Sequence, residues 1–393
     1  MSQKEVVICS AVRTPIGTFQ GALSSFSASE LGAVVVAEAV KRAGAKPDDV
    51  ERVILGNVLP AAMGQAPARQ AVIKAGLPVG VGAITINKVC GSGLQAVMFA
   101  RREILVGDAD VLVAGGMESM TNAPYALPQA RGGYRMGNGK IIDTMIHDGL
   151  WDPYDDMHMG NCGDAVAAKY GFTREDQDAF AAESYKRAQA AQKEGRFKEE
   201  IIPVTVKTKK GDTLVDTDEE PSRVQLDKMG TLRPAFSKEG TVTAANASTI
   251  NDGAAALLVT SADHAKAKGW NVLARVVADS TAAVEPKWFT IAPVGALAKL
   301  YERTKTKPLD WDLYEINEAF SGVTMAAMKE HGLPHDRVNV HGGAVSIGHP
   351  IGASGARVLV TLLHALRQRG QKTGIATLCI GGGEAVALAV ELV

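Results

Sequence analysis

Apolar residues follow two patterns along the chain, and together they predict alternating strands and helices. Short continuous apolar runs, such as Val6–Cys9 and Val111–Ala114, are typical of strands buried on both faces. Other segments, such as Glu30–Ala43 and Arg174–Gly195, carry apolar residues at helical spacing. This alternation predicts an α/β protein whose sheets are covered by helices.

The same order of predicted elements occurs twice. The pairs Lys46–Pro47 and Lys307–Pro308 are 261 positions apart, and each lies between a predicted helix and a predicted strand. The pairs Ser92–Gly93 and Ser354–Gly355 are 262 positions apart, and each opens a predicted helix. We therefore expect two copies of one α/β unit.

The repeat predicts three domains. The first copy is expected to comprise residues 1–117 and 249–270, and the second copy residues 271–393. Residues 118–248 contain Gly-rich and charged segments and are expected to form an inserted loop domain that binds substrate and takes part in oligomerisation.

Composition excludes several other classes of protein. The 393 residues carry 42 Lys and Arg against 43 Asp and Glu, which argues against a polybasic surface for nucleic acid or an anionic membrane. No apolar run approaches the ~18–20 residues that span a bilayer, and the first residues show no targeting pattern, so we expect a cytoplasmic protein. The four cysteines are far apart and form no CxxC pair, which argues against a disulfide framework or a structural zinc site.

Cys90 is the first candidate for chemistry because it directly precedes a predicted helix. The unpaired N–H groups at a helix N-terminus favour a thiolate, so we expect the pKa of this thiol to fall below ~8.5. The Gly91–Gly93 segment that follows would let a ligand approach the backbone closely. From these residues alone, a buried and unreactive cysteine is an equally good interpretation.

Three further residues stand at the ends of predicted elements. His349 lies between Gly348 and Pro350 on a loop before a predicted helix, which favours a functional over a structural role. Cys379 ends a predicted strand and is followed by glycines whose N–H groups could bind an oxyanion, with a packing role as the alternative. Asn317 follows a strand end, where α/β sheets often place ligand groups, with a helix cap as the alternative. The usual motifs for nicotinamide, ATP and zinc chemistry are absent from the sequence.

Four ordered motifs resemble the thiolase family from Val6 to the C-terminus. They are NKVCGSG at 87–93, NEAF at 317–320, GHPIG at 348–352 and CIGGG at 379–383. Within that family, MHMG at 157–160 and TAANAS at 243–248 are similar to the acetyl-CoA acetyltransferases. The resemblance implies a thiolase-like duplicated five-layer αβαβα core with an inserted loop domain, and a homotetramer.

The resemblance also implies a reaction, the reversible Claisen condensation of two acetyl-CoA molecules to acetoacetyl-CoA and CoA. That reaction needs one group to hold the first acyl group and another to deprotonate the second. By motif, Cys90 is expected to be the nucleophile, His349 to take its proton, and Cys379 to remove the α-proton. Asn317, through a water, and His349 are expected to stabilise one oxyanion, and the N–H groups of Cys90 and Gly381 the other.

Ligand-binding positions follow from the same resemblance. CoA is expected to be substrate and product, and no other cofactor is required. The residues expected to contact it are Arg223 and Lys228 at its phosphates, Ser248 at its pantetheine, and His158, Met159 and Phe320 along the tunnel. For Arg223 and Lys228 a solvated charged loop is the alternative. In potassium-activated members, K+ is bound at positions that match the Tyr185 hydroxyl and the carbonyls of Ala244, Ala245, Ala247 and Val345.

Two other functions stay open from the sequence. One is a broad-range 3-ketoacyl-CoA thiolase of fatty-acid degradation, against which Phe289 and the Met157–Met159 loop favour short acyl groups. The other is a non-catalytic acyl-CoA or lipid carrier on the same fold, which could dispense with a catalytic group, whereas here none is missing.

Overall fold

The computed structural model describes residues 4–209 and 211–393. Residues 1–3 and 210, which fall within the first predicted domain and the predicted insertion, lie outside the described residues. The strands are β1 (Val6–Arg13), β2 (Gly17–Thr18), β3 (Arg52–Gly56), β4 (Gly82–Ile86), β5 (Val111–Ser119), β6 (Tyr125–Ala126), β7 (Ile142–Asp143), β8 (Trp151–Asp152), β9 (Met157–His158), β10 (Val204–Thr208), β11 (Gly211–Val215), β12 (Asn251–Ser261), β13 (Ala274–Ala283), β14 (Leu313–Ile316), β15 (Thr373–Ile380) and β16 (Glu384–Leu392). The helices are α1 (Ala28–Arg42), α2 (Pro67–Lys74), α3 (Ser92–Val106), α4 (Met159–Tyr170), α5 (Arg174–Lys193), α6 (Ala262–Lys268), α7 (Ala292–Thr304), α8 (Ser321–His331), α9 (Ala344–Ile347) and α10 (Ile351–Gln368).

Nine strands form one hydrogen-bonded path in the order β14-β15-β16-β13-β1-β12-β5-β3-β4, and β2 pairs with β12 to complete a ten-stranded sheet. In the middle of this order, β1 and β13 are paired at only two positions, Val7–Arg275 and Ile8–Ala274. The sheet therefore consists of two halves that separate on either side of this short junction.

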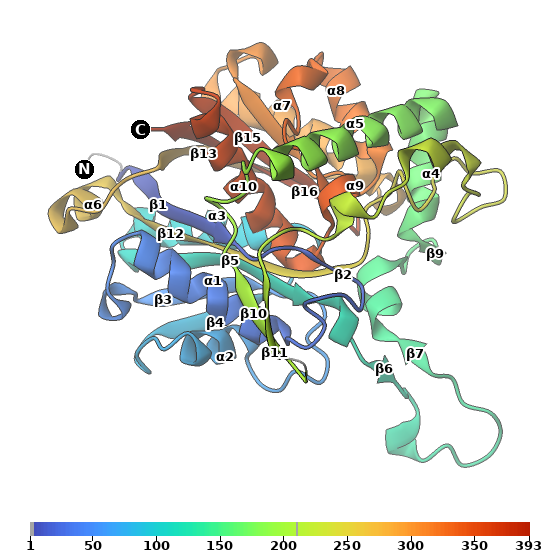
Figure 1. Cartoon of the computed structure of the whole chain (residues 1–393), viewed down its shortest axis with the longest axis horizontal. Coiled ribbons are helices and arrows are strands. Elements are labelled where there is room, and N and C mark those ends of the chain that lie inside the picture. The colour runs from blue at the N-terminus through green and yellow to red at the C-terminus, as the bar shows by residue number, and fades with distance from the viewer. Residues whose placement is uncertain (1–3, 210) are drawn as a thin grey trace.

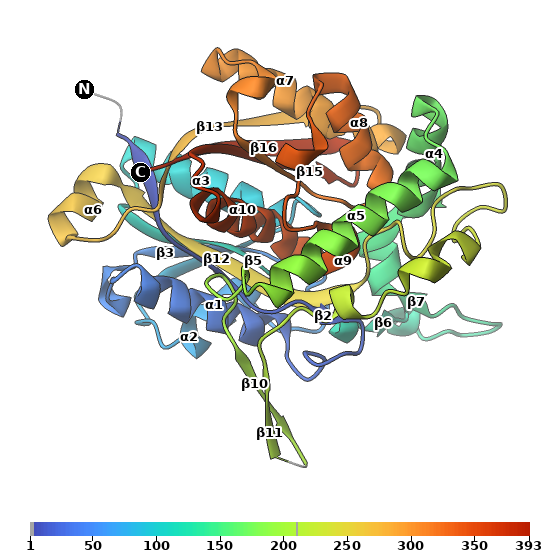
Figure 2. The ribbon, with the colours of Figure 1, turned by 45° about the horizontal axis from the view of Figure 1, so that its top comes forward.

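The two halves enclose a central pair of helices. Helices α3 and α10 pack against each other and against strands of both halves, and their apolar residues form the largest buried core. Helices α1 and α2 cover the outer face of the first half, and α7 and α8 cover the outer side of the second (Figures 1 and 2). The order of layers is helix, sheet, helix, sheet, helix, which confirms the fold class expected from the sequence.

The internal repeat is present in the strand register. In the first copy β3 pairs in parallel with β5, placing Arg52 opposite Leu112, and in the second β14 pairs in parallel with β15, placing Leu313 opposite Gly374. Arg52 and Leu313 are 261 positions apart, and Leu112 and Gly374 are 262 positions apart. These are the same separations as those of the Lys–Pro and Ser–Gly pairs in the sequence. Both copies also enter their strand through a short turn in which an aspartate caps a lysine N–H: Asp49 accepts from Lys46 at 2.8 Å and Asp310 from Lys307 at 2.7 Å.

The chain between β5 and β12 leaves the sheet and returns to it. It contains α4, α5, the β10–β11 ribbon and a projecting arm that includes β6 and β7 (Figure 1). Buried ion pairs attach part of this segment to the core, because Arg13 on β1 pairs with Glu200 at 2.6 Å and with both oxygens of Asp218 at 2.6 and 2.9 Å. Removing one partner of such a buried pair costs about 3–5 kcal/mol. The domain limits at 117/118 and 248/249 stay a prediction.

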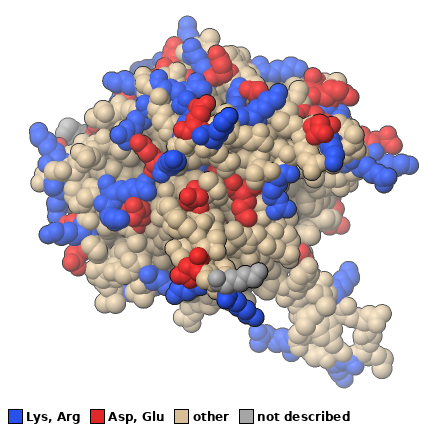
Figure 3. Space-filling view, in the orientation of Figure 1, with Lys and Arg blue, Asp and Glu red and all other residues tan. Residues whose placement is uncertain are grey.

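The molecular surface carries mixed charge. In Figure 3, Lys and Arg side chains are interspersed with Asp and Glu over the visible face of the main body. Within residues 4–209 and 211–393, no helix is long and apolar enough to cross a lipid bilayer.

Glycines bring the two central helices into backbone contact. A Cβ atom on Gly93 of α3 would lie 2.6 Å from the Ala356 nitrogen of α10. On Gly355 of α10 it would overlap the Leu94 nitrogen of α3. Because each atom that would be struck belongs to the backbone, it cannot rotate away, and the closeness of the two helices depends on the missing side chains.

We predict that Gly355→Ala lowers the free energy of unfolding by about 2 kcal/mol, since overpacking a close contact outweighs the gain in helix propensity. Gly80→Ala is the matched control, because a Cβ at Gly80 meets no atom within 4 Å. The measurement is the denaturant midpoint of both variants. Equal midpoints for the two variants would contradict the backbone contact.

Candidate active site

A strained turn presents Cys90 at the start of α3. Val89 has φ +46°, a left-handed conformation that costs a β-branched residue on the order of 1–3 kcal/mol. Side chains on both sides hold the turn: the Asn87 side-chain oxygen accepts the Val89 N–H at 2.9 Å. Ser92 Oγ accepts the Lys88 N–H at 2.8 Å and donates to the Val89 carbonyl at 2.7 Å. The turn therefore fixes the direction of the Cys90 side chain.

The expectation of a lowered pKa at Cys90 is wrong. The residue is only 7% exposed, and burial raises the pKa of its thiol to about 11. The N–H groups of Gly381 and of Cys90 itself donate toward the sulfur and act in the opposite direction, while the charge of Glu118 adds to the rise. Desolvation outweighs the helix N-terminus here, because the thiolate would have to form almost without water.

His349 is held from both its backbone and its ring. Gly348 before it has φ +109°, and its missing side chain leaves room for Asn251, whose Oδ1 accepts the His349 N–H at 2.8 Å. The His349 Nδ1 lies 2.6 Å from Ser354 Oγ, which itself donates to the Pro350 carbonyl at 2.9 Å. Since that hydroxyl proton is already used, Nδ1 carries the ring proton and Nε2 is left as the acceptor.

The imidazole is neutral in this setting. Burial, followed by the positive charge of Arg357, lowers the pKa of His349 to about 3. Asn317 lies directly after β14, is fully buried, and has its Nδ2 3.5 Å from His349 Nδ1. Its Oδ1 is buried with no hydrogen-bond partner among the described residues. The structure therefore brings Asn317 and His349 together, as the sequence motifs imply.

Cys379 approaches from the other half of the sheet. It is the second-last residue of β15 and fully buried, in a cluster with Phe289 and Phe320. Burial and the neighbouring Cys90 raise the pKa of its thiol well above the ordinary value. The segments that carry the two cysteines, which are 289 positions apart in sequence, are in contact, because a Cβ on Gly91 would overlap Cδ1 of Ile380. The glycine turn after β15 delivers the Gly381 N–H to the Cys90 sulfur.

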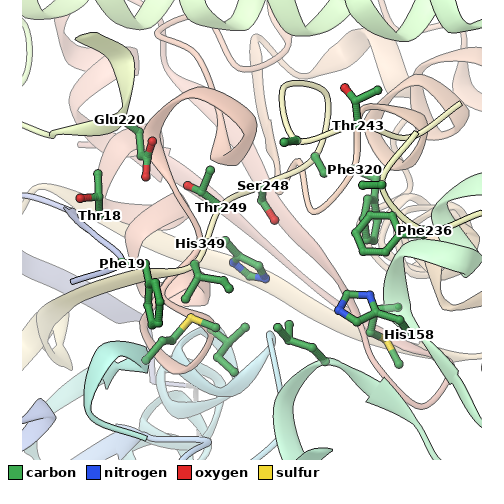
Figure 4. A pocket seen from close by; sticks show the side chains of 18 of the residues that line it. Thr18, Phe19, His158, Glu220, Phe236, Thr243, Ser248, Thr249, Phe320 and His349 are labelled. Carbon is green, nitrogen blue, oxygen red and sulfur yellow. The ribbon is translucent and has the colours of Figure 1, made fainter. Parts of the chain in front are cut away.

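A cavity of about 510 Å³ opens at His349. Among the residues that line it are Arg223, Ser248, His158, Met159, Phe320 and His349, together with Thr18, Phe19, Glu220, Phe236 and Thr249. In Figure 4 the His349 ring lies below Ser248 and to the left of His158, and Phe236 and Phe320 lie beside His158. Cys90, Cys379, Asn317 and Gly381 are not among the lining residues.

Polar contacts orient the lining side chains. His158 accepts the Gly160 N–H at 3.0 Å on its Nδ1, and its ring stacks on Phe236 with centroids 4.6 Å apart. Ser248 donates to the Ala319 carbonyl at 3.0 Å. Arg223 donates to Thr18 Oγ1 at 2.8 Å.

Lys228 is the CoA-contact candidate that the structure does not bring to this cavity. It is exposed on the short helix Leu226–Thr231.

The potassium candidates lie on one side of the same region. Tyr185, Ala245 and Val345 share a buried cluster, and Ala244 and Ala247 line the cavity. Burial raises the pKa of the Tyr185 hydroxyl, and the negative charges of Glu220 and Glu318 add to the rise. In the described ranges, no three His, Cys, Asp or Glu side chains gather closely enough to hold a metal ion.

The sequence did not indicate the buried polar residues whose hydrogen bonds support the site. Glu118, Asn251 and Ser354 are fully buried polar residues: Glu118 accepts the N–H of Gly352 at the start of α10, Asn251 accepts that of His349, and Ser354 contacts the His349 ring. For Glu118 the one signal in the sequence is its place at the end of the apolar run of β5, because a glutamate is rarely buried unless it has polar partners. Asn251 and Ser354 carry no such signal, since their partners are set by the tertiary fold.

Two family models and several named relatives match nearly the whole length of this chain. The model of the thiolase N-terminal domain matches residues 6–263, and that of the thiolase C-terminal domain matches residues 270–392. A protein of Cupriavidus necator named acetyl-CoA acetyltransferase is 54% identical over 389 residues, 98% of this chain and 99% of its own. One of Allochromatium vinosum with the same name is 52% identical, covering 99% of each chain.

Solved structures agree as well. The crystal structure of the Bacillus anthracis acetyl-CoA acetyltransferase superposes with a TM-score of 0.97 at 44% identity, covering 100% of this chain and 99% of the other. The Acat5 thiolase from Ascaris suum in complex with coenzyme A gives a TM-score of 0.95 at 44% identity, covering 99% and 100%. The chain belongs to the thiolase family.

Proposed function

We propose that this thiolase is an acetyl-CoA C-acetyltransferase, which condenses two acetyl-CoA molecules to acetoacetyl-CoA and CoA and catalyses the reverse reaction. The names of relatives that match nearly the whole chain support an acyltransferase of this kind. The observation that carries the proposal is a pair of buried thiols, of which Cys90 raises the pKa of Cys379, together with the neutral imidazole of His349, which lines a cavity.

The first half of the reaction transfers an acetyl group to Cys90. As its sulfur attacks the thioester carbonyl, its proton passes to His349 Nε2, which the hydrogen bond to Ser354 leaves free as an acceptor. The departing CoA thiolate takes the proton of Cys379. This leaves an acetylated Cys90, an imidazolium and a Cys379 thiolate, so the buried site gains an ion pair and no net charge.

The second half joins the carbons. The Cys379 thiolate removes the α-proton of a second acetyl-CoA, and the enolate attacks the acetyl group on Cys90. When the tetrahedral intermediate collapses, the Cys90 sulfur leaves and recovers its proton from the His349 imidazolium. Each group returns to its starting protonation state, and acetoacetyl-CoA is released.

Two donor pairs are proposed to stabilise the oxyanions. His349 with Asn317, the latter through a water, serves one, and the N–H groups of Cys90 and Gly381 serve the other. Support comes from their positions: Asn317 lies against His349, and both N–H groups point at the Cys90 sulfur. One such donor is typically worth about 2.7–4 kcal/mol of transition-state free energy.

CoA is proposed to occupy the cavity that opens at His349. Ser248, His158, Met159 and Phe320 would contact pantetheine, and Arg223 at the rim would face the phosphates. Lys228 is proposed to reach CoA only at its outer end, because it is exposed and outside the cavity lining.

Potassium binding is proposed at Tyr185 and the carbonyls of Ala244, Ala245, Ala247 and Val345. Support comes from the type of donor, because a hydroxyl and neutral carbonyls suit a monovalent cation, and from the clustering of Tyr185, Ala245 and Val345 near the charges of Glu220 and Glu318. A bound K+ would keep the loop that leads from Val345 to His349 in place.

A homotetramer is proposed from two exposed features. The arm between β5 and β7 exposes Tyr125, Leu127, Met136 and Ile141 away from the body (Figure 1). Strand β4 is the last in the sheet order, pairs on one side only within the part of the chain that the structure describes, and leaves Ile84 41% exposed. Apolar arms and unpaired strand edges are typically covered by other copies of a chain. The three-domain division and the cytoplasmic location are proposed on the sequence alone.

Acyl chain length separates this proposal from a broad-range 3-ketoacyl-CoA thiolase. Phe289 is 2% exposed in the cluster around Cys379, which favours a short acyl group. We predict that kcat/KM for thiolysis is at least roughly 100-fold higher with acetoacetyl-CoA than with 3-ketohexadecanoyl-CoA, because extra methylenes find no room. Cys90→Ser is the control and is expected to abolish both activities. Comparable values for the two substrates would support the broad-range thiolase, and full activity of Cys90→Ser would support a carrier.

The potassium proposal predicts a loss of activity when K+ is replaced. Exchange for a large organic cation should lower acetoacetyl-CoA thiolysis severalfold, since such an ion does not fit among carbonyls. The measurement is the initial rate at constant ionic strength, with Tyr185→Phe as the variant that should respond less. Equal rates with both cations would remove the potassium site.

A further inference from the structure

Glu118 is a buried carboxylate that the proposed reaction does not use. It lies at the end of β5, has no exposed surface, and pairs with no cation among the described residues. Instead it accepts four hydrogen bonds. Oε1 accepts Asn57 Nδ2 at 2.7 Å and the Leu59 N–H at 3.1 Å, while Oε2 accepts the Val58 and Gly352 N–H groups, each at 2.9 Å.

These four donors belong to two segments. Three of them lie in the loop after β3, and the fourth, Gly352, is the second residue of α10. N–H groups in the first turn of a helix have no partner within the helix, and a carboxylate is favourable there. The fit is tight, because a Cβ on Gly352 would lie 2.5 Å from Oε2 of Glu118.

The same two segments surround both reacting groups of the first half-reaction. Val58, Leu59 and Ile351 form one apolar cluster with Cys90. Gly352 follows His349 by three residues, and Ser354, which holds the imidazole, is two residues further along the same helix. Among the described residues, Glu118 is therefore the one side chain with hydrogen bonds both to the start of α10 and to the loop that packs against Cys90.

We propose that Glu118 is a positioning residue for acetyl transfer: its carboxylate ties the start of α10 to the loop after β3 and thereby sets the approach of His349 to Cys90. The proposal rests on the proposed function, and it concerns only the geometry of the proton transfer from Cys90 to His349. Displacing reacting groups by about 1 Å costs on the order of 100-fold in rate.

Two reactions of Cys90 separate positioning from a general structural role. Acetylation by acetyl-CoA requires His349 and the oxyanion donors, whereas alkylation by iodoacetamide requires only the thiolate. Burial raises the pKa of Glu118 to about 7, so Glu118 is mostly ionised at pH 8, where its charge raises the pKa of Cys90. Removing that charge therefore does not reduce the fraction of Cys90 thiolate at pH 8. A misplaced imidazole therefore slows acetylation alone, while a collapsed site slows both reactions.

The test is Glu118→Gln, which keeps the size and removes the charge. Whichever oxygen the amide nitrogen replaces, two of the four N–H donors then face another donor. We expect acetylation of Cys90 to be about 100-fold slower in single turnover, KM for acetyl-CoA to stay within about threefold, and alkylation at pH 8 to be unchanged or faster.

Asp312→Asn is the matched control. Asp312 also accepts backbone N–H groups, those of Lys372 at 3.0 Å and Thr373 at 2.9 Å, but lies at the far end of β15 from Cys379. The control should acetylate at the wild-type rate. Asn57→Ala, which removes one donor of the four, is a milder second variant should Glu118→Gln not fold, and is expected to slow acetylation by about tenfold.

Acetylation of Glu118→Gln within threefold of wild type, or an equal loss of acetylation and alkylation, would overturn the positioning role. If Glu118→Gln does not fold, the Asn57→Ala variant decides. Acetylation of that variant at the wild-type rate would also overturn the positioning role of Glu118. A wild-type enzyme that is not acetylated at all would overturn the proposed function instead, so the two failures are distinguishable.

Discussion

The separation of the two central helices is the constraint on which the site depends. Helix α3 begins just after Cys90, and α10 begins just after His349, so the contact between these helices sets how far the thiol lies from the imidazole. Missing side chains at Gly93 and Gly355 allow backbone to meet backbone there, inside a shell of two half-sheets. Duplication supplies this arrangement, because each copy contributes one such helix and one strand that ends beside it. Cys379 reaches the same point from the second copy's strand.

Burial gives the site its chemical character. It raises the pKa of both thiols and lowers that of the imidazole, so all three groups rest in the neutral form. A resting thiolate is therefore not the source of reactivity. In the proposed reaction, proton transfers between groups already in place supply the reactivity, which fits the backbone hydrogen bonds, the left-handed Val89 and the fixed tautomer of His349. A polar, open site would tolerate more error in position than this one does.

The sequence predicted many of the helices and strands, but few of the buried polar residues that support the site. The helix predicted at Arg174–Gly195 is found as α5 and ends two residues earlier, and the helix predicted at Glu30–Ala43 is found as α1, displaced by one or two residues, because both have clear apolar periodicity. Motifs also indicated Asn317 and His349, which the structure brings together. They could not indicate Glu118, Asn251 or Ser354, whose bonds join segments up to more than two hundred positions apart. The pKa of Cys90 was predicted with the wrong sign, since a helix N-terminus is visible in a sequence and the depth of burial is not.

The central claim is that Cys90 alone receives the first acetyl group and that Cys379 acts only afterwards. Its most direct test is peptide mass spectrometry of the enzyme after brief exposure to acetyl-CoA, for the wild type and for Cys379→Ser. The account predicts one acetyl group on the peptide that contains Cys90 in both proteins, with no acetoacetyl-CoA formed by the variant. An acetyl group on Cys379 or elsewhere, or condensation that continues in the Cys379→Ser variant, would contradict it.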